Sequence, residues 1–87
     1  MNRVHVPTPL RAYTGERAEV EAAGSTMAAL LEDLDQRFAG IRFRMVDEQD
    51  RIRQHIRMFV DGEMVREISH PVQPGQEIQI LCALSGG

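Results

Sequence analysis

The chain has 87 residues, of which 43% are hydrophobic and 26% charged, which is typical of one soluble globular domain with a modest core. Its net charge of −3 gives no basic footprint for nucleic acid or an anionic membrane, and no apolar stretch approaches the roughly 20 residues of a membrane span. One cysteine excludes an intrachain disulfide, and the N-terminus lacks the apolar core of a signal peptide, so we expect a cytoplasmic protein.

The first 22 residues predict a β-hairpin. Apolar and polar residues alternate over residues 3–6 and again over 17–22, with a turn around Gly15 between them. Pro7 and Pro9 end the first strand. The side chains expected to face inward are Val4, Val6, Ala18, Val20 and Ala22.

The pattern then changes to that of one amphipathic helix. Ser25 or Thr26 can cap its N-terminus, and Gly40 is expected to end it as the C′ residue. Asp33 and Arg37 form an i,i+4 ion pair on the polar side. The apolar stripe, at three- and four-residue spacing, consists of Met27, Leu30, Leu31, Leu34 and Phe38.

The second half predicts a loop and three more strands. Residues 42–54 are charged and irregular, and we expect a solvated loop tethered by Phe43, Met45 and Val46. Asp61-Gly62, between two strand-like runs, is typical of a type I′ hairpin turn. Residues 77–83 alternate as a final strand, with Ile78, Ile80 and Cys82 on one face.

One amphipathic helix cannot bury its stripe alone, so it requires a sheet to pack against. We therefore predict an α+β roll, a mixed four- to five-stranded sheet with one main helix on one face and the final strand in the centre. A hairpin, a crossover helix and a returning strand are the elements of the β-grasp, or ubiquitin-like, fold. The predicted core contains Val4, Val6, Val20, Leu30, Leu31, Leu34, Phe38, Ile56, Met58, Ile78 and Ile80.

No self-contained active site is evident in the sequence. The histidines at positions 5, 55 and 70 lack metal-ligand spacing, so we predict no metal site. Cys82 alternates with isoleucines and is interpreted as a structural thiol. Neither a nucleophile elbow nor a phosphate-binding loop is present, and one cysteine cannot ligate an iron–sulfur cluster. We expect a protein that is not an enzyme and binds no cofactor of its own.

The C-terminal segment is the remaining candidate. Gly86 and Gly87 follow an apolar strand almost directly, separated by Leu84 and Ser85. Glycine has no Cβ, so a narrow channel in a partner enzyme admits it and its acyl carbon is unhindered. A carboxylate becomes reactive once a better leaving group is attached, and adenylation by an ATP-using partner would supply one.

These motifs resemble the MoaD/ThiS family of ubiquitin-like small sulfur carriers over essentially the whole chain, 1–87. The opening "VHVPTPLRAYTGE" is most similar to the CysO-type, MoaD-like carriers of cysteine biosynthesis. The other matching stretches are the helix "GSTMAALLEDLDQRFAGI", the hairpin "FVDGEMVRE" and the closing "VQPGQEIQILCALSGG". Leu84-Ser85 and Gln76 depart from the family, which commonly has Val-Ala and Asp there.

The resemblance implies a mechanism. An E1-like adenylating enzyme of the ThiF/MoeB type would activate Gly87 with ATP, and a sulfur donor protein would convert it to a thiocarboxylate. A flexible tail, residues 84–87, would carry this group into partner active sites. The acceptor would be an enzyme such as a cysteine synthase-like protein or a molybdopterin synthase large subunit-like protein. The pathway could equally be that of cysteine, molybdopterin, thiamin or a similar product.

Two other functions remain open. The same activated tail could be attacked by a lysine, which would make the protein a ubiquitin-like modifier. Alternatively the chain could be a noncovalent small subunit of a molybdopterin-synthase-like complex. For any of these, we predict a partner surface formed by Phe59, Leu81 and Ala83 on the sheet face away from the helix. The competing interpretation is that the 42–54 loop covers these three side chains.

Overall fold

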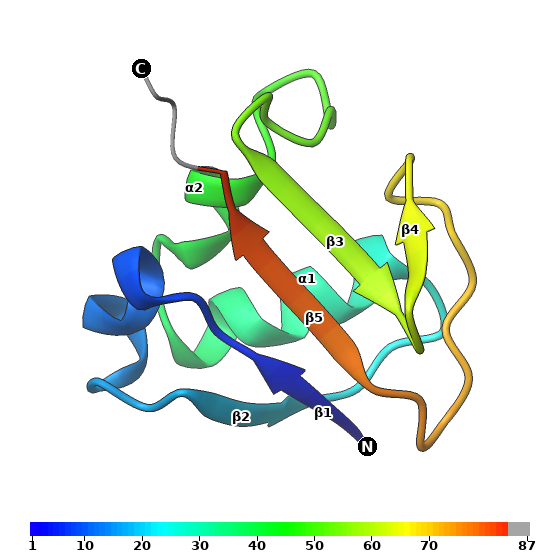
Figure 1. Ribbon diagram of the computed structural model, residues 1–87, viewed down its shortest axis with the longest axis horizontal. Coiled ribbons are helices and arrows are strands. Elements are labelled where there is room, and N and C mark those ends of the chain that lie inside the picture. The colour runs from blue at the N-terminus through cyan, green and yellow to red at the C-terminus, as the bar shows by residue number, and fades with distance from the viewer. Residues whose placement is uncertain (84–87) are drawn as a thin grey trace.

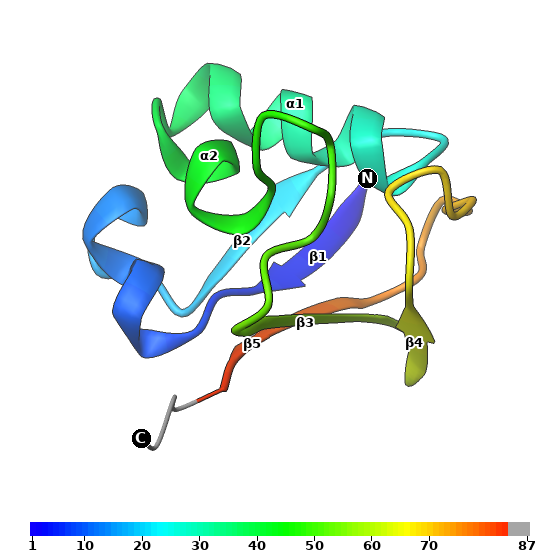
Figure 2. The same ribbon diagram turned by 90° about the horizontal axis from the view of Figure 1, so that it is seen from above.

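A computed structural model describes residues 1–83, and Figures 1 and 2 show its two layers, a sheet and the helices on one side of it. Two α-helices, one 3-10 helix and five strands make up this part of the chain. Their bounds are β1 Asn2–His5, η1 Thr8–Thr14, β2 Glu19–Ala22, α1 Met27–Arg37, α2 Ile41–Met45, β3 Ile56–Val60, β4 Glu63–Val65 and β5 Ile78–Cys82.

The five strands form one mixed sheet in the order β2-β1-β5-β3-β4, so the final strand is central as predicted. β5 runs parallel to β1, with Val4 beside Ile78, and antiparallel to β3, with Met58 beside Ile80. The chain crosses from the β1–β2 hairpin to the rest of the sheet through α1, which covers one face (Figure 2). This arrangement confirms the α+β β-grasp roll.

Helix α1 begins as its sequence predicts. The Thr26 side-chain oxygen accepts a hydrogen bond from the Ala29 backbone N–H at 3.2 Å, which satisfies one of the unpaired donors at the helix start. On the polar side, Arg37 donates to Asp33 at 2.7 Å. The apolar stripe of α1 faces the sheet, and four of its five predicted members are fully buried, whereas Phe38 is half-buried against the core.

The predicted core is otherwise confirmed. Ten of its eleven residues are buried, Phe38 being the exception. The β3–β4 turn also forms as expected, because Asp61 and Gly62 adopt the positive φ angles, 48° and 86°, that a type I′ turn requires. Local turn chemistry and the helix stripe thus account for most of this architecture.

The predicted chain path is wrong at several points. Pro9 lies within the first turn of η1, a 3-10 helix not foreseen from the sequence. Ala18 is exposed because β2 begins only at Glu19. α1 is capped at Phe38, so Gly40 is not its C′ residue; with φ 96° it instead precedes α2.

Helix α2 replaces the start of the predicted 42–54 loop. Ile41 and Met45, one helical turn apart, are buried and attach α2 to the core, and Val46 is also buried. Phe43 points the other way and is 57% exposed, so its predicted tethering role is wrong. The sequence after α2 is held by a bridge between Val46 and Ile52.

Candidate functional site

The candidate site is the end of β5, which we call the tail base. β5 is flanked on both sides, by β1 and β3, and its pairing continues past the strand itself. The Ala83 backbone N–H donates to the His55 carbonyl at 2.7 Å, just beyond the Ile56–Cys82 pair. The chain is therefore anchored as far as Ala83. The predicted tail residues Leu84, Ser85, Gly86 and Gly87 lie outside the described residues.

The predicted partner surface lies on the open face of the sheet, opposite the helices. Leu81 is 42% exposed, Ala83 is exposed and Phe59 is half-buried. Phe59 is paired with Gln79, which makes it a diagonal neighbour of Leu81 on the same face. The segment between α2 and β3 lies on the helix side, so the interpretation that it covers these side chains is wrong (Figure 2). Their role in binding a partner stays a prediction.

The far part of the open face carries negative charge. His5 on β1 contacts Glu19 on β2 through Nδ1 at 3.3 Å and Glu77, just before β5, through Nε2 at 2.7 Å. From the sequence, His5 is considered only as a metal ligand and is assigned no role. The structure shows that it connects the first, second and last strands through two carboxylates.

Cys82 is the only thiol near the tail base. It is half-buried on the helix side of β5 and packs against the core. Burial raises the pKa of the Cys82 thiol, and the nearby Arg44 guanidinium offsets this effect only in part. A thiol with a raised pKa remains protonated at neutral pH and is a poor nucleophile. This agrees with its interpretation as a structural residue.

A second group of side chains lies beside the tail base and was missed from the sequence. Phe43, Arg44, Arg53 and His55 line a depression of about 210 Å³, and we call them the Phe43 patch. The Arg53 guanidinium lies over the Phe43 ring, 4.5 Å from its centroid, and its Nε donates to the Phe43 carbonyl at 2.7 Å. The available sequence signal was "RFR" directly after a buried Ile41, but a five-residue helix is too short to show a period.

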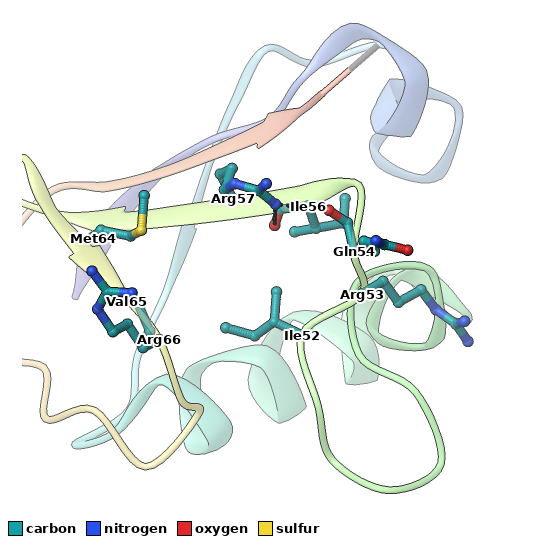
Figure 3. A pocket seen from close by; sticks show the side chains of 8 residues that line it. All are labelled: Ile52, Arg53, Gln54, Ile56, Arg57, Met64, Val65 and Arg66. Carbon is teal, nitrogen blue, oxygen red and sulfur yellow. Dashed lines mark hydrogen bonds between the residues drawn. The ribbon is translucent and has the colours of Figure 1, made fainter. Parts of the chain in front are cut away.

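A wider, shallow groove of about 490 Å³ separates β4 from the segment before β3. Figure 3 shows Ile52 and Ile56 beside it, Arg66 next to β4 and Arg53 on the opposite side, with its guanidinium pointing away from the groove. Arg57 satisfies two backbone acceptors at the start of β3, because its Nη1 donates to the carbonyls of Gln54 and Ile56. The groove is therefore bordered by arginines on an apolar base.

Residues 1–83 contain no group of three or more histidine, cysteine, aspartate or glutamate side chains placed to hold a metal ion. Within the same range, none of the helices has the length and hydrophobicity needed to cross a membrane.

Both the sequence and the fold of this chain match known proteins. The model of the ThiS family matches residues 4–87. The sulfur carrier protein CysO of Mycobacterium tuberculosis is 32% identical over 89 residues, covering 97% of this chain and 96% of that protein. Its solved relative, the crystal structure of Mycobacterium tuberculosis CysO, superimposes with a TM-score of 0.92 at 29% identity, covering 97% of this chain and all of that one.

A second solved structure is a complex of two proteins. The CysO in the BexX/CysO complex of Amycolatopsis orientalis matches with a TM-score of 0.93 and 36% identity, and each chain is covered completely. The family match includes the tail base and the final glycines in one continuous range. The chain therefore belongs to the ThiS family.

Proposed function

We propose that this protein is a sulfur carrier, that Gly87 bears the sulfur as a thiocarboxylate, and that partner enzymes act on the protein as their co-substrate. The observation that carries the proposal is the tail base: a central strand, whose pairing on the β3 side continues through Ala83, directly precedes Leu-Ser-Gly-Gly. Membership of the ThiS family and the likeness to proteins named sulfur carriers support it.

The chemistry requires three steps at Gly87, taken here as the terminal residue. In the first, the carboxylate attacks the α-phosphorus of ATP in an E1-like enzyme of the ThiF/MoeB type, forming an acyl-adenylate and releasing pyrophosphate. In the second, a persulfide on a sulfur donor protein attacks the acyl carbon and displaces AMP. A thiol then cleaves the S–S bond of the resulting acyl disulfide, which leaves the thiocarboxylate on Gly87. ATP belongs to the partner, and this chain binds no cofactor.

The contribution of this chain is positional. A four-residue extended segment spans at most about 13–14 Å, so an active site must lie within that distance of Ala83 to react with Gly87. The hydrogen bond from Ala83 to His55 holds the origin of the tail in place, which lowers the entropy lost when the tail enters a partner. Glycine at the last two positions lets the acyl group pass through a narrow channel.

Partner proteins follow from this chemistry. The Amycolatopsis orientalis CysO occurs in a complex with BexX, and we propose that the present chain likewise binds partner proteins. These are the adenylating enzyme, the sulfur donor and an acceptor that is cysteine synthase-like or molybdopterin synthase large subunit-like, all in the cytoplasm. Phe59, Leu81 and Ala83 form the proposed contact on the open face of the sheet.

The proposal is tested by incubating the protein with its adenylating enzyme, ATP and a sulfur donor. Mass spectrometry should find one carboxylate oxygen exchanged for sulfur, and fragmentation should locate the change at Gly87. The Cys82→Ala variant should be modified at the same rate, because the thiol takes no part. Isopeptide-linked conjugates in a cell extract would instead favour the modifier, and a stable complex without sulfur uptake would favour the noncovalent subunit.

Deleting Gly87 tests the position of the acyl group. The tail would be shortened by roughly 3.3–3.6 Å, and a misplacement of about 1 Å can already cost an active site a hundredfold in rate. The truncated chain should stay folded and be thiolated at least about 100-fold more slowly. A chain with one residue added after Gly87 should be similarly slow. If the truncated chain is thiolated as fast as the full one, Gly87 does not carry the sulfur.

A further inference from the structure

The Phe43 patch combines exposed aromatic surface with positive charge. Phe43 is 57% exposed and is the most exposed phenylalanine or tyrosine side chain among residues 1–83. Arg44 and His55 are also exposed, and Arg53 is half-buried on the Phe43 ring. Aromatic and arginine side chains are enriched at protein–protein contacts, where they supply much of the binding energy. Composition therefore makes this patch a candidate interface.

The patch is also prepared to receive an anion. Its two guanidinium groups, on Arg44 and Arg53, have no carboxylate within 4.0 Å in the part of the chain that the structure describes. The Nε of Arg53 is fixed to the Phe43 carbonyl, which orients the rest of the group without using its terminal N–H donors. A guanidinium held in this way loses little side-chain entropy when it binds a carboxylate.

The position of the patch connects it with the tail. His55 lines the depression and accepts the hydrogen bond from Ala83, and Arg44 is close enough to Cys82 to influence its thiol electrostatically. The backbone of Arg53 is tied to α2 through the Met45 carbonyl at 2.9 Å. A protein that takes the tail must approach the end of β5, and the patch is beside that end.

The charges favour a protein partner over a nucleic acid. The whole chain has a net charge of −3, and Glu19 and Glu77 lie together with His5 on the far part of the open face. A long polyanion would meet these carboxylates, whereas a protein can offer an acidic surface limited to the patch. The separation of the two charged regions also gives such a partner one preferred orientation.

We propose that the Phe43 patch docks onto an acidic surface of the enzyme that activates Gly87, with Phe43 covered by an apolar part of that surface. This inference rests on the proposed function. Arg44 and Arg53 steer the encounter and pair with the partner's carboxylates, and Phe43 is buried in the contact. The adenylating enzyme then contacts the carrier on two sides of the tail base, at the patch and at the open-face residues Phe59 and Leu81.

The test measures ATP–pyrophosphate exchange by the adenylating enzyme at increasing concentrations of carrier. The Arg44→Glu/Arg53→Glu variant should raise the KM for the carrier at least about tenfold at low salt, since contacts between opposite charges govern encounter, with little change in kcat. Raising the ionic strength from about 0.05 to 0.5 M should weaken wild type more than this variant. Phe43→Ala should raise KM without altering the salt dependence.

The single variants Arg44→Glu and Arg53→Glu should each raise KM as well, and Arg66→Glu is their matched control, because Arg66 is exposed and lies across the groove from Arg53 (Figure 3). Thermal unfolding of every variant checks the fold. If wild type is activated and the patch variants are activated with an unchanged KM, the docking role is refuted while the sulfur-carrier function stands. An equal rise in KM for Arg66→Glu would also refute it. Absence of activation in wild type itself refutes the proposed function instead.

Discussion

Two substitutions of the same kind, Leu34→Ala and Leu81→Ala, separate the stability of this fold from its proposed function. Leu34 is 0% exposed in the helix stripe, whereas Leu81 is 42% exposed on the open face. Each change removes three carbon atoms, whose transfer from water contributes about 0.8 kcal/mol each. For Leu34 this gives about 2.4 kcal/mol, and the cavity left in the core raises the expected cost to about 3–4 kcal/mol.

Leu81→Ala leaves no cavity, and much of its surface is already in water, so its cost should be at most about 1.5 kcal/mol. The free energy of unfolding, measured by urea titration followed by circular dichroism, should show this difference. In thermal unfolding, Leu34→Ala should lower Tm by roughly 12–32 °C, from about 4–8 °C per kcal/mol in a domain this small. A chain of this size has roughly 4–13 kcal/mol of stability, so the variant should still fold at room temperature.

The kinetics of activation by the adenylating enzyme should rank the two variants in the opposite order. Leu81→Ala should raise the KM of activation because it removes part of the proposed contact surface, while Leu34→Ala should leave activation unchanged below its melting temperature. Equal stability costs for the two variants would refute the assignment of the α1 stripe to the core. An unchanged KM for Leu81→Ala would remove Leu81 from the partner surface.

Three further predictions test single features. Phe59→Asp should weaken activation by the adenylating partner without unfolding the domain, and unchanged kinetics would exclude Phe59 from the contact. Asp33 accepts from the Ala23 N–H at 2.9 Å, which lowers the pKa of this carboxyl. The ionised Asp33 should stabilise the fold fully above the ordinary pKa of an aspartate, and this stabilisation should be lost as the pH falls through the lower pKa of Asp33 in the folded state. The midpoint of urea unfolding should therefore fall less in Asp33→Asn than in wild type between about pH 5 and pH 2. Gly24→Ala would place a Cβ 2.4 Å from the Leu30 backbone nitrogen, and a cost of about 1–3 kcal/mol is expected in urea unfolding; a neutral effect would contradict this close packing.

The features that were predicted correctly have local causes or follow from the need to bury a stripe. Asp61-Gly62 specifies its turn through two backbone angles, and Thr26 caps α1 through one hydrogen bond. The apolar stripe of the helix requires a sheet to cover it, and the apolar final strand β5 is the one expected at the centre of that sheet. In each case a few neighbouring residues contain the information.

The features that were missed depend on contacts between distant segments. α2 is stable because Ile41 and Met45 enter a core built by other elements, and five residues show no readable period. The exposure of Phe43 follows from that helix, since burial of Ile41 and Met45 turns Phe43 outward. The patch beside the tail base arises only when residues 43–55 fold back toward β5, a placement that composition alone cannot show.

The order of the strands links folding of the protein to presentation of its tail. β1 with β2, and β3 with β4, are local hairpins, and they are connected in the sheet only through β5. An isolated two-stranded hairpin is marginal in water, so neither half gains much stability until β5 is inserted between them. The strand that positions the tail is thus the one that completes the sheet. An incompletely folded copy offers no fixed tail base, so the proposed sulfur loading would be restricted to molecules that have finished folding.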